Sequence, residues 1–188
     1  SWDNSVLAEF NVVQQANFSC LALPYGTCTL SMDNLDRRFE PRNKNGVFRS
    51  IEERQGIDIS IGVDGGDYQH VGIFYQYSGG WKTGDNGTTM QWSLVDIVGL
   101  LADRQYLPPD TLPTTLQGWA ASLVSQLGTN FENAYVVDTN LENISLTANV
   151  EDVNGKSCGE ILRMLCMASG TFPRADAATG RLAIEPYW

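Results

Sequence analysis

The sequence contains a single histidine, His70, so a catalytic Ser-His-Asp or Cys-His group would have to use that residue. A metal site built from several histidines is excluded for the same reason. The four cysteines, Cys20, Cys28, Cys158 and Cys166, form two pairs with seven intervening residues each, which differs from the spacing of zinc knuckles. An even number of cysteines permits two disulfides in an exported protein. Because Cys158 and Cys166 lie in an apolar helical pattern, we instead expect reduced cysteines packed in the core.

Basic residues are scarce: 12 Lys and Arg stand against 22 Asp and Glu, which gives a formal net charge of −10. Nucleic acids and anionic membranes attract clustered cations, so we expect no specific nucleic-acid binding and no membrane association. The apolar runs are shorter than the ~20 residues of a membrane-spanning helix. The 188 residues are 43% hydrophobic, which is enough for a substantial core. Since the chain begins at Ser1 without a methionine, we expect a processed or excised part of a longer product.

The first half of the chain has the short alternating segments and glycine-rich turns of antiparallel β structure. Strands are predicted over residues 5–13, 27–33, 57–63, 68–77 and 88–93. Alternation with period two places every second side chain on the core face. The expected core-facing residues of the second and third strands are Cys28, Leu30, Met32, Ile57, Ile59, Ile61 and Val63. Asp64-Gly65-Gly66-Asp67 predicts a hairpin turn between the third and fourth strands.

From residue 94 the apolar period changes to that of helices. Helices are predicted over residues 94–101, 113–128 and 157–169, and strands over 134–137, 144–150 and 181–185. Ser157 and Glu160 form a capping box at the start of the third helix, and Gly170 ends it. We therefore predict an α+β protein. A mainly antiparallel, barrel- or sandwich-like β domain over residues 1–93 precedes a mixed helix–strand region over residues 94–188.

No group of residues has the pattern of a catalytic, metal or phosphate site. The adjacent carboxylates Glu52-Glu53 and Glu151-Asp152 would point to opposite faces of a strand, which does not suit a two-acid hydrolase. Residues 33–36 lack the glycine and the closing glutamate of a calcium loop, and are expected to form Asx turns. Trp92 and Trp119 fall on apolar positions of the core. We expect no enzyme activity, no metal and no cofactor.

The stretch from Leu23 to Pro41 combines a small-residue turn, an alternating strand and an Asp-Asn-x-Asp-Arg-x-Phe-x-Pro loop. The loop residues are Asp33, Asn34, Asp36, Arg37, Phe39 and Pro41. Gly72, Phe74 and Tyr75 follow in a Gly-x-Phe-Tyr strand, and Asp96 precedes a Leu-rich helix. In this order the blocks, with residues 157–186 as a later helix and strand pair, resemble phage and prophage tail proteins of Gram-positive bacteria. Within that group, they are similar to the baseplate-hub or tail-associated proteins.

This resemblance implies a structural virion component and not an enzyme. Its barrel-like tube domains would assemble as a homo-oligomeric ring, commonly a trimer, around the DNA passage, and residues 94–188 would be a second, partial tube-like domain. The expected partners are further copies of the chain and other tail or baseplate proteins. The expected location is the virion tail, after assembly in the bacterial cytoplasm, where cysteines stay reduced. The negative charge would let DNA pass through the ring without binding.

Two other functions are compatible with the residues alone. A carbohydrate-binding β domain for host-surface attachment requires exposed Trp or Tyr rings that stack on sugars. A hydrolase requires paired carboxylates with raised pKa values in a cleft.

Overall fold

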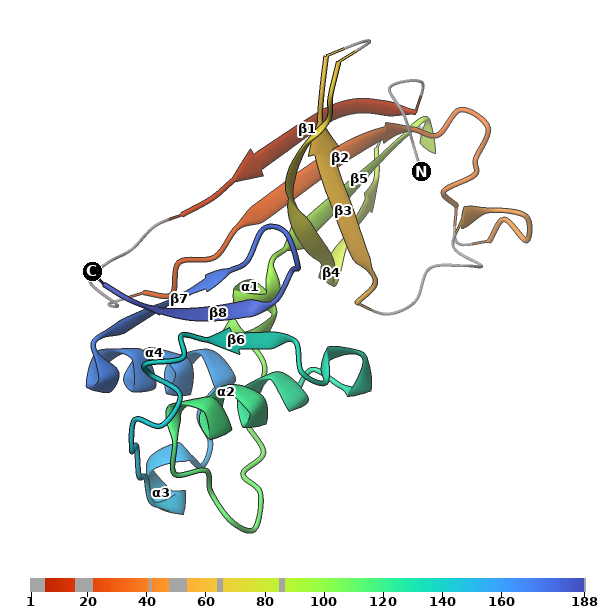
Figure 1. The fold of residues 1–188 in the computed structure, drawn as a ribbon. Helices are drawn as coiled ribbons and strands as arrows, with labels where there is room; N and C mark the ends of the chain where they lie inside the picture. Colours follow the sequence, from red (N-terminus) through yellow and green to blue (C-terminus); the bar gives the residue numbers. More distant parts are fainter. Residues whose placement is uncertain are drawn as a thin grey trace.

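The structure, a computed structural model, describes residues 6–15, 22–40, 42–47, 54–63, 66–84 and 87–187. The fold is α+β, as predicted. A five-stranded antiparallel sheet lies beside a layer of helices that carries a small three-stranded mixed sheet (Figure 1). Within the described ranges, no helix is both long and apolar enough to cross a bilayer.

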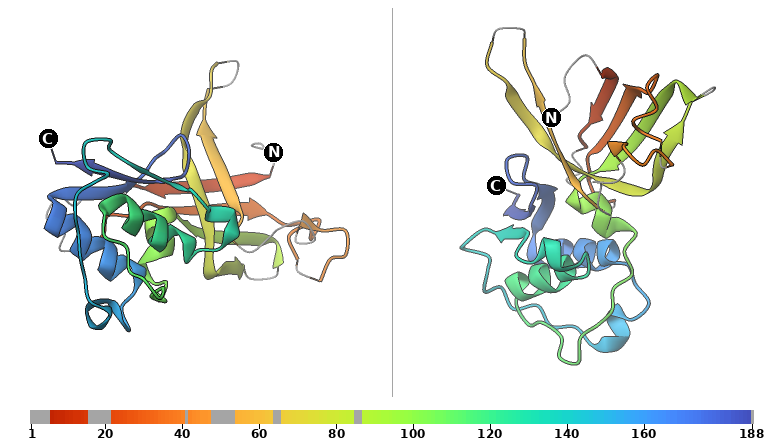
Figure 2. Two further views of the ribbon diagram at one scale, coloured as in Figure 1. Left: turned by 60° about the horizontal axis from the view of Figure 1, so that its bottom comes forward. Right: turned by 90° about the vertical axis from the view of Figure 1, so that its right-hand side faces the viewer.

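The large sheet contains five strands in the order β1-β2-β5-β4-β3. Their bounds are β1 (Leu7–Val13), β2 (Thr27–Asp33), β3 (Gly56–Ile61), β4 (Gln69–Thr83) and β5 (Thr89–Val95). The register of β4 against β5 shifts between Gln76 and Trp81, an irregularity of the kind that bends a strand. The β3–β4 hairpin consequently projects away from the other strands (Figure 2). Among the described strands β1 and β3 each keep a free edge, so the predicted barrel is not closed.

The predicted alternation is confirmed in β2 and only in part in β3. Cys28, Leu30 and Met32 are buried in the first core, together with Phe39, Phe74, Met90, Trp92 and Leu94. Ile57 and Ile59 pack against this core, but Ile61 and Val63 are 45% and 76% exposed. Ile61 ends β3 and Val63 follows it, on the side of the β3–β4 hairpin that projects away from the other strands (Figure 2). Asp64 and Gly65 of the predicted turn lie outside the described residues.

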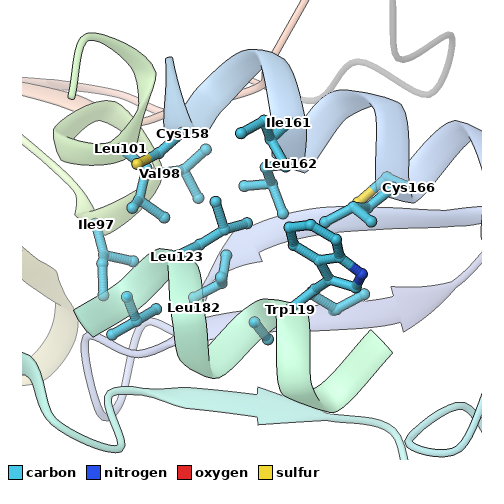
Figure 3. Close-up of a cluster of buried hydrophobic side chains, with 14 of the residues drawn as sticks. Ile97, Val98, Leu101, Trp119, Leu123, Cys158, Ile161, Leu162, Cys166 and Leu182 are labelled. Carbon is cyan, nitrogen blue, oxygen red and sulfur yellow. The ribbon is translucent and has the colours of Figure 1, made fainter. Parts of the chain in front are cut away.

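The second half folds around a core of its own. Its elements are α1 (Ile97–Ala102), α2 (Leu116–Ser125), the 3-10 helix η3 (Thr129–Phe131), β6 (Tyr135–Val137), α3 (Val150–Val153), α4 (Cys158–Ser169), β7 (Thr171–Ala175) and β8 (Leu182–Pro186). The small sheet has the order β6-β8-β7, with β6 parallel and β7 antiparallel to β8. Trp119 and Leu123 of α2, Leu162 of α4 and Leu182 of β8 meet α1 in this second core (Figure 3). The domain division at residues 93 and 94 stays a prediction.

In the second half, the start of one predicted helix and one predicted strand are wrong. Leu94 and Val95 belong to β5, and the helix begins only at Ile97 because the extended backbone of Asp96 caps it. Residues 144–150 do not form a strand: they contain one isolated bridge, at Ser145, and end where α3 begins. Asn149 and Asp152 form a capping box that starts this helix, so local capping overrides the β-branched composition.

The other local predictions of this half are confirmed. Ser157 and Glu160 form the predicted capping box of α4, and Gly170 ends the helix with a φ of 66°. Of the cysteines of the whole chain, Cys28, Cys158 and Cys166 are buried in the cores, as expected. Cys20 lies outside the described residues.

Helices α1 and α4 approach each other closely at Gly159, and this contact gives the first prediction. A Cβ added there would lie 2.7 Å from the Cα of Ala102 and 3.0 Å from its carbonyl oxygen, so the backbones would have to separate. We expect Gly159→Ala to lower the free energy of unfolding by about 1–3 kcal/mol. Chemical denaturation measures the change.

Gly118→Ala in α2 is the matched control, because its Cβ would meet only Pro113 and Thr115, both at 3.2 Å. At this position alanine has the higher helix propensity, and this gain of up to about 1 kcal/mol offsets the cost of the new contacts. Equal effects of the two substitutions would contradict the close approach of α1 and α4.

Candidate functional site

Asp96 lies where the large sheet meets the helical layer. Its side chain is buried, with 7% of the residue exposed. One carboxylate oxygen accepts the backbone N–H of Gly26 at 2.5 Å, just before β2, and the other accepts the N–H of Gly99 at 2.9 Å, in the first turn of α1. The backbone N–H of Asp96 donates to the carbonyl of Gly26 at 3.0 Å. A single side chain therefore fixes the start of β2 against the start of α1.

The environment of Asp96 acts on its charge in two opposing ways. Burial raises the pKa of the carboxyl group to about 6, although the backbone N–H groups of Gly26, Gly99 and Val98 lower it. Ionisation is favoured by donors that point at the oxygens and opposed by the loss of water. Both oxygens are already engaged with the backbone, so the geometry describes a structural carboxylate.

Glycines are required on both sides of this carboxylate. A Cβ at Gly26 would lie 3.0 Å from the Asp96 oxygen that its own N–H approaches. A Cβ at Gly99 would lie 2.7 Å from the Cβ of Val95. The two glycines allow the backbone N–H groups to reach the acid, and neither was singled out from the sequence.

Strand β4 connects the two cores through neighbouring residues. Phe74 is buried in the first core, and a Cβ at Gly72 would lie 3.2 Å from its ring. Tyr75 points to the other side, where its ring centroid lies 5.1 Å from that of Phe131. Its hydroxyl donates to the carbonyl of Gly180 at 3.3 Å. Burial, followed by the negative charge of Asp96, raises the pKa of Tyr75, so the phenol stays a neutral donor.

A cleft of about 320 Å³ lies beside Asp96, with β4 on one side and β7 on the other. Asp176 is the other carboxylate that lines it, and the pKa of Asp176 is lowered, first by a hydrogen bond from Thr179. In a two-acid hydrolase one carboxyl group has a raised pKa and holds a proton, while the other stays ionised. The opposite pKa shifts of Asp96 and Asp176 are compatible with such a pair, so the hydrolase remains an alternative.

The motif loop that follows β2 is held together by Asn34, which is completely buried. Its side-chain oxygen accepts the N–H of Phe39 at 2.9 Å, and its amide nitrogen donates to the carbonyl of Gly87 at 3.0 Å. Phe39, also buried, inserts into the first core with its ring edge-to-face against Trp92, at a centroid distance of 6.4 Å. The conformation of the loop thus serves to place one phenylalanine in the core.

The charged residues of the motif make local contacts. The carboxylates of Asp33 and Asp36 accept N–H groups two residues further on, at 2.9 and 3.1 Å, which confirms the predicted Asx turns. Arg37 has a φ of 58° and lies 3.6 Å from the carboxylate of Glu40. Pro41 lies outside the described residues. No group of three potential metal-ligating side chains occurs in the part of the chain that the structure describes.

The predicted site residues form two separate groups. Asp33 pairs with Thr89 at one end of the β2–β5 ladder, and Thr27 pairs with Val95 at the other, next to Asp96. Seven-residue strands place these ends about 20 Å apart. Gly72, Phe74, Tyr75 and Asp96 meet at the junction, whereas the motif loop lies at the far end of the sheet (Figure 1).

The remaining candidate surface is formed by the free edges of the large sheet. Large apolar side chains are exposed on or beside these edges: Phe10 by 39%, Val13 by 44%, Ile61 by 45%, Tyr68 by 73% and Val63 by 76%. A free edge presents unpaired backbone groups that can pair with another strand. Strands β1 and β3 therefore combine an edge of the large sheet with exposed apolar side chains.

The tryptophan positions bear on glycan binding. Trp92 and Trp119 are buried, as predicted, and Trp81 is partly buried with its ring 5.7 Å from that of Trp92. No tryptophan of the described residues is exposed, but Tyr68 and Tyr77 are exposed by 73% and 37%, so exposed aromatic rings of the kind that a carbohydrate-binding surface requires are present.

The raised pKa of Asp96 predicts a pH-dependent stability. Between the ordinary pKa of 3.8 and the folded value of about 6, the folded state binds more protons than the unfolded state. Stability from this group is therefore present at low pH and lost as the pH rises through 6, by roughly 2–3 kcal/mol in total. Asp96→Asn removes the titration. The unfolding free energy of wild type minus that of the variant should fall by this amount between pH 4 and 7.5, whereas a constant difference would contradict the buried carboxyl.

The motif loop gives a second prediction. Asn34→Ala leaves the N–H of Phe39 and the carbonyl of Gly87 without their partner, and we expect a loss of about 2–3 kcal/mol. Asp36→Ala is the matched control, because this exposed side chain bonds to Arg38 of its own loop and should change stability far less than Asn34→Ala. Thermal and chemical unfolding compare the two. A loss of stability confined to Asp36→Ala would show that the loop is held by its surface charges.

Comparison with known proteins identifies a solved structure with a similar fold. No protein-family model and no curated protein sequence matches the chain. Among solved structures, the fold is similar to that of a 43 kDa tail protein of prophage MuSo2 from Shewanella oneidensis, with a TM-score of 0.53 and 16% sequence identity. The match covers 97% of this chain and 51% of the tail protein, so the chain spans about half the length of the protein that it matches. At this identity the similarity shows a shared fold.

Proposed function

We propose that the chain is a structural component of a phage or prophage tail, in the baseplate hub, where copies assemble into a ring around the DNA passage. The observation that carries this proposal is the fold that 97% of the chain shares with a prophage tail protein. The motif blocks from Leu23 to Asp96 support it independently, since they were found from the sequence alone. The protein would assemble in the bacterial cytoplasm and end in the virion tail, and a Gram-positive host stays a prediction.

The free edges of the large sheet support assembly into a ring. If β1 of one copy pairs with β3 of the next, every copy uses both edges and no edge stays open once the ring is closed. The apolar side chains of Phe10 and Ile61 would then be covered by the neighbouring copy. We propose a trimer, the stoichiometry that the resemblance implies, and contacts to other tail or baseplate proteins.

A structural role also agrees with the chemistry of the motif residues. Asn34, Phe39 and Asp96 use their polar groups and rings to hold the backbone and the core. We propose that the chain is not an enzyme and needs no cofactor. The net charge of −10 would give the ring a negative lumen, so that DNA passes without binding.

Deletion of the gene tests this function. Without the protein, we expect lysates to contain heads and incomplete tails, and a plasmid copy of the gene should restore complete tails in electron micrographs. Infectious particles with normal tails in the deletion strain would contradict a structural role.

Substitutions on the two edges test the ring. Phe10→Lys on β1 and Ile61→Lys on β3 put a charge beside each edge, and we expect either to reduce the number of complete tails at least tenfold. Met167→Lys on α4 is the matched control, because this side chain is 54% exposed and far in sequence from both edges. Thermal unfolding within a few degrees of wild type would show that the variants fold. Normal tails from both edge variants would refute assembly through these strands.

A further inference from the structure

A second pocket, of about 410 Å³, lies where the start of β3, the loop after η3 and the turn between β7 and β8 come together. Its charged lining residues are Arg54, Glu132 and Arg181, and Asn133 and Thr179 add polar groups. Two cations therefore stand against one anion, in a chain whose formal net charge is −10. The lining of the pocket is therefore positively charged, whereas the chain as a whole is acidic.

The two arginines of the pocket have no carboxylate partner among the described residues. Elsewhere in the chain arginines do pair: Arg174 donates two hydrogen bonds to Glu185, at 2.8 and 2.6 Å. A guanidinium group has five N–H donors in a planar fork that matches the oxygens of a carboxylate or a phosphate. The pocket thus presents donors of this kind that no carboxylate of the described residues neutralises.

The position of Arg54 is fixed by backbone and side chain together. One guanidinium nitrogen donates to the carbonyl of Leu127, just after α2, which holds the side chain against the helical layer. The backbone of Arg54 has a φ of 59°, a left-handed conformation that disfavours residues with a Cβ. Such strain is common where a side chain is held for binding. A glycine would relieve the strain at Arg54 but would remove the cation.

We propose that this pocket binds a small oxyanion, a phosphate or a carboxylate group, through the guanidinium groups of Arg54 and Arg181. The remaining N–H donors of Arg54 and those of Arg181 bind its oxygens, and Glu132 opposes it by charge. The bound anion would link the start of β3 to the turn between β7 and β8, and so join the large sheet to the second half of the chain. This binding is independent of the tail function.

Titration of the isolated chain with inorganic phosphate, and separately with succinate, tests the proposal at constant ionic strength, with chloride as reference. We expect saturable NMR shifts of the backbone amides of residues 54–56 and 179–181. Tighter binding of phosphate would assign a phosphate ligand, and tighter binding of succinate would assign a carboxylate. Shifts that are absent, or that rise linearly without saturation for both anions, would overturn the proposal.

Three variants distinguish the pocket from general charge effects. Arg181→Gln should weaken anion binding at least tenfold, and Glu132→Gln should strengthen it several-fold. Arg163→Gln is the matched control, because this arginine lies on α4, outside the pocket lining, where it donates to the sulfur of Met167. Equal weakening by Arg163→Gln and Arg181→Gln would overturn the site. The titration measures anion binding by the isolated chain. An absence of binding would therefore leave the proposed tail function untouched.

Discussion

The carboxylate of Asp96 is the interaction on which the arrangement of the two halves depends. A buried carboxylate is unfavourable unless donors replace the lost water, and here the N–H groups of Gly26 and Gly99 do so from two different elements. The same acid ends β5 and caps α1, so it sets the direction in which the first helix leaves the sheet. The second core is then built on that helix, with Trp119 and Leu162 packed around it (Figure 3).

Strand β4 supports the same junction from the other side. Phe74 and Tyr75 are neighbours, and the pleat of the strand sends one ring into each core. The hydroxyl of Tyr75 reaches the carbonyl of Gly180, which fixes the turn between β7 and β8 against the sheet. This contact brings Arg181 to the start of β3, where Arg54 lies, so the proposed anion site is a consequence of how the two halves meet.

Local signals in the sequence predicted much of the fold, and contacts between distant segments account for what they missed. Alternation predicts β2 correctly, and the capping box at Ser157 predicts the start of α4, because each signal depends on residues close together in the sequence. Leu94 and Val95 were assigned to a helix because an apolar run fits a buried strand as well as a helix. The exposure of Val63 depends on the bend of β4, and the role of Asn34 depends on Gly87, more than fifty residues away. Neither dependence leaves a pattern in the local sequence.

The motif loop after β2 and the proposed assembly surface on β1 and β3 are separate parts of the molecule. The motif residues alone therefore could not identify the assembly surface. Asn34 and Phe39 hold the loop and the first core, whereas the edges of β1 and β3 carry the proposed contacts between copies.

Electron cryomicroscopy of purified tails from the phage or induced prophage is the most direct test of the proposed ring. The account predicts that this fold surrounds the tail axis, with β1 of each copy beside β3 of the next. Tails without this fold, or with both edges facing solvent, would contradict it.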